Sequence, residues 1–286
     1  MNTLSPHLDA LIALALAEDL GPGDVTSLAT IDDDAVARAE VRAKQDLVLA
    51  GVEVFTRVFE RLDPRVQVVA RFCDATRVRK GDVVLEVTGP TRSLLGGERV
   101  GLNFLMHLSG IATHTAQLRT RLKMFPTVAL LDTRKTTPGL RDLEKAAVRA
   151  GGGVNHRHGL FDGVLIKDNH ITAAGSVAAA VHLARRHAHH LLKVQVEAST
   201  LDQVEQALVA GADALLLDNM DDALLRSAVQ VARALKPDAF LEASGNMTAE
   251  RLSAVAATGV DAISMGGLTH SAVAVDLSMK LVPGQA

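Results

Sequence analysis

Short apolar runs and one amphipathic segment dominate the chain between residues 36 and 88. The pattern predicts strands over 36–42, 66–72 and 83–88, a helix over 52–62, and a turn at Lys80-Gly81-Asp82. Before them, apolar side chains recur at helical spacing and predict an amphipathic helix (Leu4, Leu8, Leu11, Ile12, Ala15 and Leu16). These elements together predict a small α/β sandwich, in which helices pack on an open sheet.

Apolar strands and helical patterns alternate regularly in the second half of the chain. Strands are predicted at 128–131, 163–166, 191–196, 214–217, 239–241 and 260–263, with helical patterns between them at 140–149, 201–209 and 223–235. This alternation is typical of parallel βα units. A mostly helical stretch over 91–123, which we expect to break near Ser109-Gly110, joins the two regions.

Polar residues end each strand of the second region, at 132–135, Lys167, Glu197, Asp218, 242–244 and 264–266. Successive strands that deliver polar side chains to one rim build the active site of a (β/α) barrel. A doubly wound sheet is the competing fold, but its ligand would sit at one switch point only. Six strands rather than eight predict an incomplete barrel. The predicted fold class is therefore α/β, with an N-terminal α/β sandwich domain over 1–110. An incomplete (β/α) TIM-like barrel domain over 111–286 follows, and its C-terminal tail can pack back on the first domain.

Composition narrows the classes of function. A net charge of -3 argues against a general nucleic-acid binder, and the absence of Trp and Tyr removes aromatic platforms for bases. The single cysteine, Cys73, excludes an internal disulfide and a cysteine-rich metal cage. The apolar run at 11–17 lacks the cationic start of a secretory signal, because the first lysine or arginine is Arg38. No apolar run reaches the length of a membrane span. We expect a cytoplasmic protein that binds neither nucleic acid nor membrane.

Cationic side chains gather after the first two predicted barrel strands, in spite of the negative net charge. They are Arg134, Lys135, His156, Arg157, Lys167 and His170. Each of them alone could equally be a solvated surface charge. As a set at successive strand ends they predict a site for a small anion, since arginine binds carboxylate or phosphate with two parallel hydrogen bonds and lysine adds a compact positive charge.

Acidic residues and glycine turns complete the predicted site. Glu197 and Asp218 are two carboxylates in a cationic setting and most simply hold magnesium, with water and substrate oxygens in its shell. Ser244-Gly245-Asn246 and Met265-Gly266-Gly267 each follow a strand and open into a helix, which favours phosphate binding by backbone N–H groups. By contrast, the histidines at 182, 187, 189 and 190 lack nearby carboxylates and are interpreted as a polar helix end. Gly21-Pro22-Gly23-Asp24 is interpreted as a capping turn.

Several long motifs, in this order, resemble those of the quinolinate phosphoribosyltransferase family. They are EDLGPGDVTS from Glu18, GERVGLNFLMHLSGIAT from Gly97, DTRKTTPGLR from Asp132, GGGVNHR from Gly151, DGVLIKDNHI from Asp162, VEAS from Val196, LLLDNM from Leu215, LEASGN from Leu241 and ISMGGLTHS from Ile263. The resemblance covers nearly the whole chain. Departures are minor: Gly267 stands where the family often has alanine, and His158 lies at a variable position.

The resemblance implies an enzyme that joins quinolinate to 5-phosphoribosyl 1-pyrophosphate. The products are nicotinate mononucleotide, pyrophosphate and carbon dioxide, in de novo NAD biosynthesis. It implies an N-terminal sandwich, an incomplete barrel and a homodimer or higher homo-oligomer. It also assigns roles to residues. The quinolinate ligands would be Arg134, His156, Arg157 and Lys167, with Arg99 from the partner subunit, and Thr133 would also bind substrate. The phosphoribosyl pyrophosphate and its magnesium would be served by Lys135, Glu197 and Asp218. The turns at 244–246 and 265–267 would take the 5-phosphate.

The catalytic set implied by the family is Lys135, Lys167, Glu197 and Asp218. Lys167 could steer the ring or protonate the carbon that loses its carboxyl group, and the sequence leaves both roles open. Two other functions compete with this one. A homologue associated with molybdenum transport shares the fold, but the His156-Arg157 pair and the TRKTTPG motif favour the quinolinate enzyme. A non-catalytic barrel that binds phosphorylated metabolites is disfavoured because Glu197 and Asp218 accompany the full cationic set.

Overall fold

The structure, a computed structural model, describes residues 6–283, which group into two compact units. The N-terminal unit contains 6–116, 137–152 and 271–283, and the barrel unit contains 117–136 and 153–270. The domain boundary proposed at residue 110 lies inside one continuous helix, α4 (Thr91–Arg121). Two segments of the proposed second domain, 137–152 and 271–283, group with the N-terminal unit.

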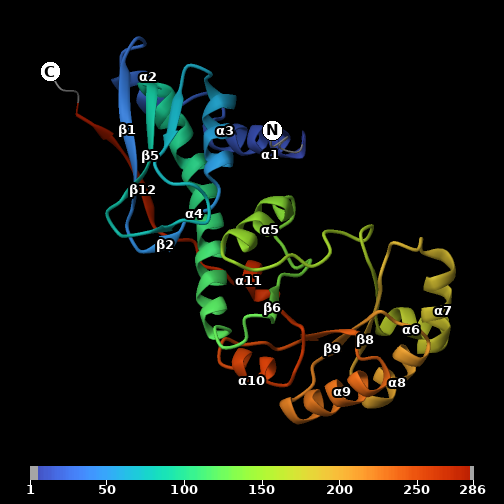
Figure 1. Ribbon diagram of the computed structural model, residues 1–286. Helices are drawn as coiled ribbons and strands as arrows, with labels where there is room; N and C mark the ends of the chain where they lie inside the picture. The colour runs from blue at the N-terminus through green and yellow to red at the C-terminus, as the bar shows by residue number, and fades with distance from the viewer. Residues whose placement is uncertain (1–5, 284–286) are drawn as a thin grey trace. The chain divides into compact units, whose positions relative to one another are not determined.

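A four-stranded antiparallel sheet forms the centre of the N-terminal unit (Figure 1). Its strands run in the order β12 (Leu277–Val282), β1 (Val36–Ala43), β5 (Val83–Pro90) and β3 (Gln67–Ala70), and the short strands β2 (Leu47–Val48) and β4 (Arg77–Val78) pair with each other. The strands predicted at 36–42, 66–72 and 83–88 are all present. The C-terminal segment does return to this sheet, because β12 pairs with β1.

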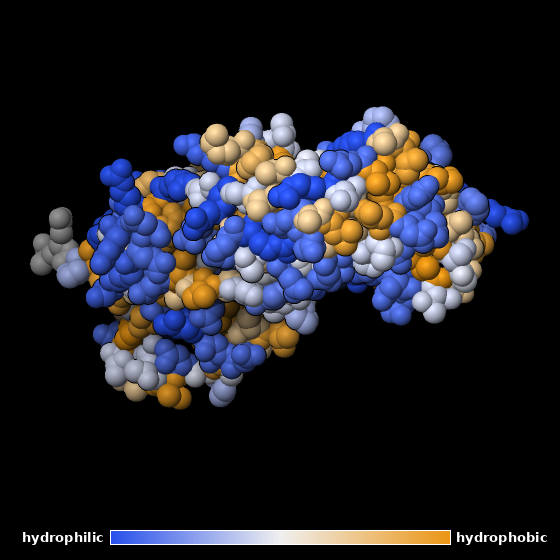
Figure 2. All heavy atoms as spheres, turned by 90° about the horizontal axis from the view of Figure 1, so that it is seen from below, coloured by the Kyte–Doolittle hydropathy of each residue, from blue (hydrophilic) through white to orange (hydrophobic). Residues whose placement is uncertain are grey.

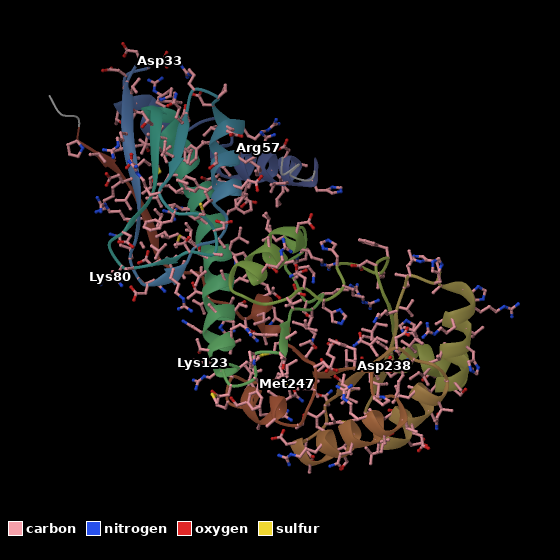
Figure 3. The ribbon with its side chains drawn as sticks, viewed as in Figure 1. Asp33, Arg57, Lys80, Lys123, Asp238 and Met247 are labelled. Atoms are coloured by element: carbon pink, nitrogen blue, oxygen red, sulfur yellow. The ribbon has the colours of Figure 1, made fainter. Side chains whose placement is uncertain are left out.

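Helices α1 (Pro6–Leu20), α2 (Val25–Thr30), α3 (Val52–Leu62) and α5 (Arg141–Ala150) complete the N-terminal unit together with the first part of α4. The predicted amphipathic helix is α1, which buries Leu8, Ile12 and Leu16; Leu4 lies outside the described residues. Helix α3 matches its predicted bounds and buries Phe55 and Phe59, whose rings lie 5.1 Å apart in the core. Its other face carries Arg57, labelled in Figure 3, which contacts both carboxylate oxygens of Asp9 in α1 at 2.8 Å.

Helix α4 runs unbroken through Ser109 and Gly110, so the predicted break there is wrong. Both residues are small because other segments of the N-terminal unit pass close to the helix. Ser109 Oγ accepts from Ala50 N at 3.0 Å and donates to Ala50 O at 3.1 Å. A Cβ atom on Gly110 would lie only 2.3 Å from the carbonyl oxygen of Val273. Close packing against other segments, and not a break in the helix, explains why small residues occupy positions 109 and 110.

The barrel unit is built on six parallel strands, as predicted. They are β6 (Ala129–Leu131), β7 (Val164–Ile166), β8 (Val194–Ala198), β9 (Ala214–Asp218), β10 (Phe240–Ser244) and β11 (Ala262–Ser264), in the spatial order β6-β11-β10-β9-β8-β7. Strands β7 and β6 are the two edges, and no ladder joins them among the described residues. Val154 forms a single parallel bridge with Leu131 beside β6. The sheet is therefore an incomplete barrel.

Helices follow the strands of the barrel unit (Figure 1). They are α6 (Asp168–Ala174), α7 (Val177–His187), α8 (Leu201–Val209), α9 (Asp222–Leu235), α10 (Leu252–Ala256) and α11 (Gly267–His270). Side-chain oxygens of Ser176, Thr200 and Asp221 cap α7, α8 and α9, so a polar residue starts each of these helices. Asp24 caps α2 in the same way, which confirms the predicted capping turn.

Polar and apolar residues are interspersed on the face that Figure 2 shows. None of the described helices is long and apolar enough to cross a membrane.

Candidate active site

The ends of the barrel strands place the predicted polar residues on a common face. Glu197 pairs in register with Leu216, and Leu216 pairs with Glu242. Asp218, two residues beyond Leu216, pairs with Ser244. Residues at one level of parallel strands, and those two positions further along, point to the same face. Glu197, Asp218, Glu242 and Ser244 therefore face the same side of the sheet, near its carboxyl edge.

Lys167 and Glu197 are joined directly at this edge. Lys167 follows β7, whose Ile166 pairs with Val196 of β8, so the two side chains stand next to each other. Lys167 Nζ donates to Glu197 Oε2 at 2.8 Å. The lysine is about half exposed and the glutamate is mostly buried, with 47% and 16% of their side chains accessible. The pair leaves the ammonium group open to a ligand on its solvent side.

Arg134 and Arg157 form the cationic part of the site. Arg157 is partly buried, and its Nη1 donates to the carbonyl oxygen of Gly163 at 2.9 Å. Burial and, after it, the nearby charge of Arg134 lower the pKa of Arg157 from its ordinary value. Two guanidinium groups that repel each other in this way would be stabilised by an anion between them. The arrangement suits a ligand with more than one carboxylate.

Two buried carboxylates hold the segment that carries His156 and Arg157. Asp132 is fully buried at the end of β6 and accepts from His156 N at 2.8 Å and from Asn155 Nδ2 at 2.6 Å. Glu242 is 1% exposed, and its Oε2 lies 3.2 Å from His156 Nε2. Sequence reasoning counted both acids among the polar strand ends and gave them no role in the site. Their burial is the missing information, and it depends on how distant strands pack.

Hydrogen bonds to Glu242 oppose the effect of its burial. Gln195 Nε2 donates to its Oε2 at 2.8 Å. Burial alone would raise the pKa of Glu242, but hydrogen bonds from His156, Ser264 and Gln195 and the charge of His156 outweigh it and lower the pKa. Gln195 was also missed from the sequence, where its signal is a single polar residue inside the apolar strand β8.

Lys135 lies against the glycine turn at 265–267. Thr133 Oγ1 accepts from Lys135 N at 3.0 Å, and Thr269 Oγ1 donates to Lys135 O at 2.7 Å. A Cβ atom on Gly266 would lie 2.7 Å from Lys135 Cδ, so only glycine leaves room for the lysine side chain as it stands. The structure thus brings Thr133, Lys135 and the second glycine turn together.

Asn219 joins Asp218 to the first glycine turn, and sequence reasoning missed it. Asn219 Nδ2 donates to Asp218 Oδ2 at 2.6 Å, while its Oδ1 accepts from Asn246 Nδ2 at 3.0 Å. Asn219, Gly245 and Asn246 all have positive φ angles of 55°, 86° and 48°. A Cβ atom on Gly245 would lie 2.3 Å from Asn219 Oδ1. The signal in the sequence is an asparagine directly after a strand, since asparagine tolerates the left-handed region.

The two carboxylates proposed for magnesium fit a metal that is held largely by its substrate. Among residues 6–283, no group of three or more His, Cys, Asp or Glu side chains is arranged to hold a metal ion. Glu197 and Asp218 offer carboxylate oxygens on one face of adjacent strands. Magnesium commonly keeps waters and phosphate oxygens and takes only one or two protein carboxylates. This donor set fits such an ion.

Arg99 belongs to the N-terminal unit, where it is exposed on α4. Its Nη2 lies 4.0 Å from Glu98 Oε1, and 57% of its side chain is accessible. The guanidinium group is therefore accessible to a second molecule.

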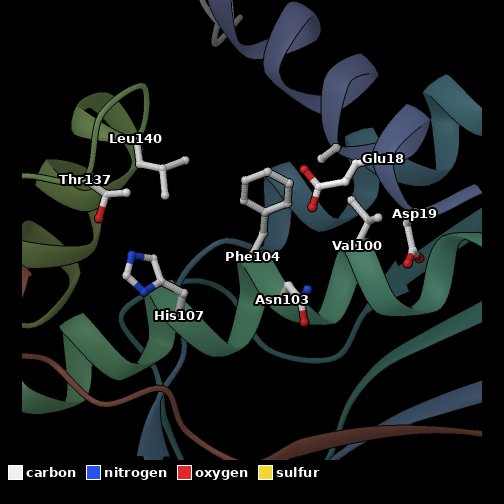
Figure 4. A pocket seen from close by; sticks show the side chains of 9 residues that line it. Glu18, Asp19, Val100, Asn103, Phe104, His107, Thr137 and Leu140 are labelled. Atoms are coloured by element: carbon white, nitrogen blue, oxygen red, sulfur yellow. The ribbon is translucent and has the colours of Figure 1, made fainter.

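The N-terminal unit also contains a pocket of about 350 Å³ (Figure 4). Its lining comes from α1, α4 and the segment before α5 (Ala15, Glu18, Asp19, Val100, Asn103, Phe104, His107, Thr137 and Leu140). His107 Nε2 lies 2.9 Å from the buried Glu144 Oε1, and Glu144 Oε2 accepts from Thr137 N at 3.2 Å. His107 is thus hydrogen-bonded to a buried carboxylate of the same unit. None of the predicted site residues lines this pocket.

Comparison with known proteins gives a consistent match along the chain. The quinolinate phosphoribosyl transferase N-terminal domain matches residues 24–109, and the C-terminal domain of the same name matches residues 111–280. A probable nicotinate-nucleotide pyrophosphorylase [carboxylating] from Bacillus subtilis is 44% identical over 98% of this chain and 94% of its own length. A chloroplastic nicotinate-nucleotide pyrophosphorylase [carboxylating] from Arabidopsis thaliana is 40% identical over 96% of this chain and 82% of its own. Among solved structures, the nicotinate-nucleotide pyrophosphorylase from Francisella tularensis has a TM-score of 0.92 at 38% identity and covers 98% of both chains.

Proposed function

The chain belongs to the quinolinate phosphoribosyltransferase family, and we propose that the residues at the carboxyl edge of its barrel sheet carry out the reaction of that family. The protein is a pentosyltransferase that transfers the phosphoribosyl group of 5-phosphoribosyl 1-pyrophosphate to quinolinate with loss of carbon dioxide. The product is nicotinate mononucleotide, a precursor in NAD biosynthesis. The observation that carries the assignment is the match of both family domains over residues 24–109 and 111–280.

Quinolinate is held by the cationic half of the site. Arg134, Arg157 and Lys167 supply positive charge to its two carboxylates, and Thr133 lies beside them. The pKa of Arg157, lowered by burial and then by the charge of Arg134, supports this role, because a bound anion would stabilise both guanidinium groups. Binding both carboxylates fixes the ring, so its nitrogen can be presented to the anomeric carbon of the sugar.

The phosphoribosyl substrate occupies the acidic half and the glycine turns. The turns at 244–246 and 265–267 bind the 5-phosphate through backbone N–H groups. Lys135 lies against the second turn and stabilises the negative charge of the departing pyrophosphate. Magnesium would be held by Glu197 and Asp218, with water and pyrophosphate oxygens, and when bound it would neutralise charge on the leaving group.

Carbon–nitrogen bond formation and decarboxylation then follow in order. The ring nitrogen attacks the anomeric carbon as the bond to pyrophosphate breaks. The nitrogen becomes cationic, so the electron pair left by carbon dioxide on the adjacent carbon is stabilised by neighbouring positive charge. A proton replaces the lost carboxyl group. Lys167 is close enough to the site to steer the ring or supply this proton, and Glu197 orients its ammonium group.

The active site is completed by a second subunit. The partner's Arg99 reaches the quinolinate carboxylates, which makes a homodimer the smallest active assembly. The exposed guanidinium group of Arg99 on α4 supports this role.

Product formation tests the proposed function. Purified protein is mixed with magnesium, quinolinate and 5-phosphoribosyl 1-pyrophosphate, and nicotinate mononucleotide is quantified by chromatography. Lys135→Ala and Glu197→Ala provide inactive controls, and EDTA is expected to stop the reaction until magnesium is restored. If the unmodified protein makes no more product than these variants, the proposal is wrong.

A further inference from the structure

The backbone of Lys135 is hydrogen-bonded on both sides. The residue lies beyond the end of β6, in a segment that is neither helix nor strand, and it is exposed. Its N–H donates to Thr133 Oγ1 at 3.0 Å, and its carbonyl oxygen accepts from Thr269 Oγ1 at 2.7 Å. Thr269 comes 134 residues later in the chain, so the second bond connects the lysine to the segment that follows another strand.

Thr269 has one hydroxyl proton, and the contacts assign it to Lys135. Its Oγ1 lies 2.7 Å from Lys135 O and 3.1 Å from Gly266 O. Gly266 O already accepts from the N–H groups of Thr269 and His270, each at 3.2 Å. A hydroxyl has a single proton to donate, so the shorter contact takes it. Thr269 is only 2% exposed, and water is therefore a poor substitute for this donor.

The threonine joins the two segments beyond the sheet. Strands β6 and β11 pair in parallel, and Met265 N donates to Leu131 O at 3.0 Å where they end. After this point one segment continues to Lys135 and the other makes the glycine turn at 265–267. The stem of the lysine occupies the space that a Cβ atom on Gly266 would need, since Cδ would lie 2.7 Å from it. The bond from Thr269 thus keeps the lysine stem against the turn.

We propose that Thr269 is a positioning residue for Lys135. Its hydroxyl holds the lysine on the second glycine turn, so that the ammonium group meets the pyrophosphate of a substrate whose 5-phosphate is bound at that turn. The inference rests on the proposed function and adds a residue that acts through Lys135 and not by contact with substrate. A lysine side chain loses much rotamer freedom when it is ordered. A fixed backbone and stem reduce the number of positions that Nζ can take before substrate binds.

Three variants separate this role from a contribution to the fold. Thr269→Val keeps the branched shape and removes the hydroxyl, whereas Thr269→Ser keeps the hydroxyl. Thr258→Val is the matched control, because Thr258 is also buried in the barrel unit and its Oγ1 donates to a backbone carbonyl, Val255 O, at 2.6 Å. That bond lies within the turn after α10 and does not involve Lys135.

Steady-state kinetics provide the first test. We expect Thr269→Val to lower kcat roughly 10- to 100-fold with KM for quinolinate nearly unchanged, because a displaced charge stabilises the leaving group poorly. Thr269→Ser should retain most of kcat. Thr258→Val should lower the thermal midpoint about as much as Thr269→Val and leave kcat unchanged. If Thr269→Val loses no more kcat than Thr258→Val, or if serine is as defective as valine, the inference is wrong.

Hydrogen exchange tests the anchoring without substrate. The amides of Lys135 and Thr136 donate hydrogen bonds within residues 132–138, so their exchange reports how firmly the segment is held. Mass spectrometry of this region should show faster exchange in Thr269→Val than in wild type, Thr269→Ser or Thr258→Val. Equal exchange in all four would overturn the inference. A wild-type protein that forms no nicotinate mononucleotide would reject the proposed function, while faster exchange in Thr269→Val would still support the anchoring of Lys135.

Discussion

At the residue scale, Glu197 interacts with a lysine and lies on the same face as a second carboxylate. It accepts from Lys167 at 2.8 Å, and it faces the same side of the sheet as Asp218. Such a half-exposed ion pair contributes little to stability, about 0–1 kcal/mol. We therefore expect its position between the cationic and acidic groups to matter for the proposed reaction and not for the fold.

Replacing Glu197 should separate activity from stability. We expect Glu197→Gln to lower kcat by roughly 100-fold or more, as loss of a group that stabilises developing charge commonly does. The free energy of unfolding should change by less than about 1 kcal/mol. Glu205→Gln, an exposed change on neighbouring α8, is the matched control and should leave both values unchanged. A Glu197→Gln enzyme with near-normal kcat would show that this carboxylate does not act in the reaction.

Residues of the site were predictable where a strand ends in a charged side chain. Arg134, Lys135, Lys167, Glu197 and Asp218 all follow or end apolar strands, and a parallel sheet brings such positions to one edge. Their supporting residues were not predictable from the sequence in the same way. The roles of Asp132, Gln195, Asn219 and Glu242 come from contacts between strands, and those contacts depend on register and burial.

At the scale of elements, Asp63 ends α3 and connects it to the start of α4. Its carboxylate accepts from Arg65 N, Arg65 Nε and Arg65 Nη2 and from Ser93 Oγ, the last at 2.6 Å. Hydrogen bonds from Arg65, against the opposing effect of burial, hold the pKa of Asp63 well below its ordinary value. The carboxylate is buried, so these bonds are poorly replaced by water.

The lowered pKa makes the contribution of Asp63 depend on pH. An aspartate in the unfolded chain binds its proton near pH 4, whereas Asp63 in the folded protein stays ionised to lower pH. Its contribution to the free energy of unfolding is therefore present above about pH 4 and is lost as the pH falls toward the pKa of the folded state. We expect Asp63→Asn to lower the free energy of unfolding at pH 7 by roughly 1–3 kcal/mol. The difference from wild type should shrink in urea unfolding below about pH 4. The control is Asp238→Asn, an exposed site labelled in Figure 3, which should show no such dependence.

Two glycines of α4 should respond differently to the same substitution. A Cβ atom on Gly110 would meet the backbone at Val273. One on Gly96 would meet the ends of two side chains, Leu20 at 3.1 Å and Leu62 at 3.8 Å. We expect Gly110→Ala to destabilise the protein by about 1–3 kcal/mol or more, because backbone cannot move aside as a side chain can. Gly96→Ala should be close to neutral. Equal thermal midpoints for the two variants would show that the close approach at Gly110 does not limit which residue can stand there without loss of stability.

Element types were largely predictable, and the error at Ser109-Gly110 shows where prediction ended. Hydrophobic periodicity correctly indicated α3, α8 and the six barrel strands, since each buries one face or lies within a sheet. A serine and a glycine inside a helix are local signs of a break. Here they permit contacts with Ala50 and Val273, residues distant in sequence, and a local pattern cannot contain that information.

At the scale of the whole molecule, the proposed trans role of Arg99 predicts complementation between two inactive variants. Arg99→Ala removes the side chain that would enter the partner's site, and Lys135→Ala removes a side chain from the site of the same chain. Each variant alone should be nearly inactive. Random dimers of the two should regain about one quarter of wild-type activity, because half of the dimers are mixed and each of these has one intact site.

Co-expression of the two variants with different affinity tags, followed by isolation of the doubly tagged dimer, tests this prediction. Wild-type protein with the same tags is the control for activity. A mixed dimer as inactive as its parents would contradict the shared site, and so would a monomeric wild-type enzyme in gel filtration.

The central claim is that one site joins the ring nitrogen to the sugar and releases the adjacent carboxyl group. Quinolinate labelled with ¹³C in the carboxyl next to the nitrogen tests it most directly, with magnesium, 5-phosphoribosyl 1-pyrophosphate and the wild-type protein. We predict equal amounts of nicotinate mononucleotide, pyrophosphate and labelled carbon dioxide, and none of them with Lys135→Ala. Carbon dioxide without nucleotide, or no product at all, would contradict the account.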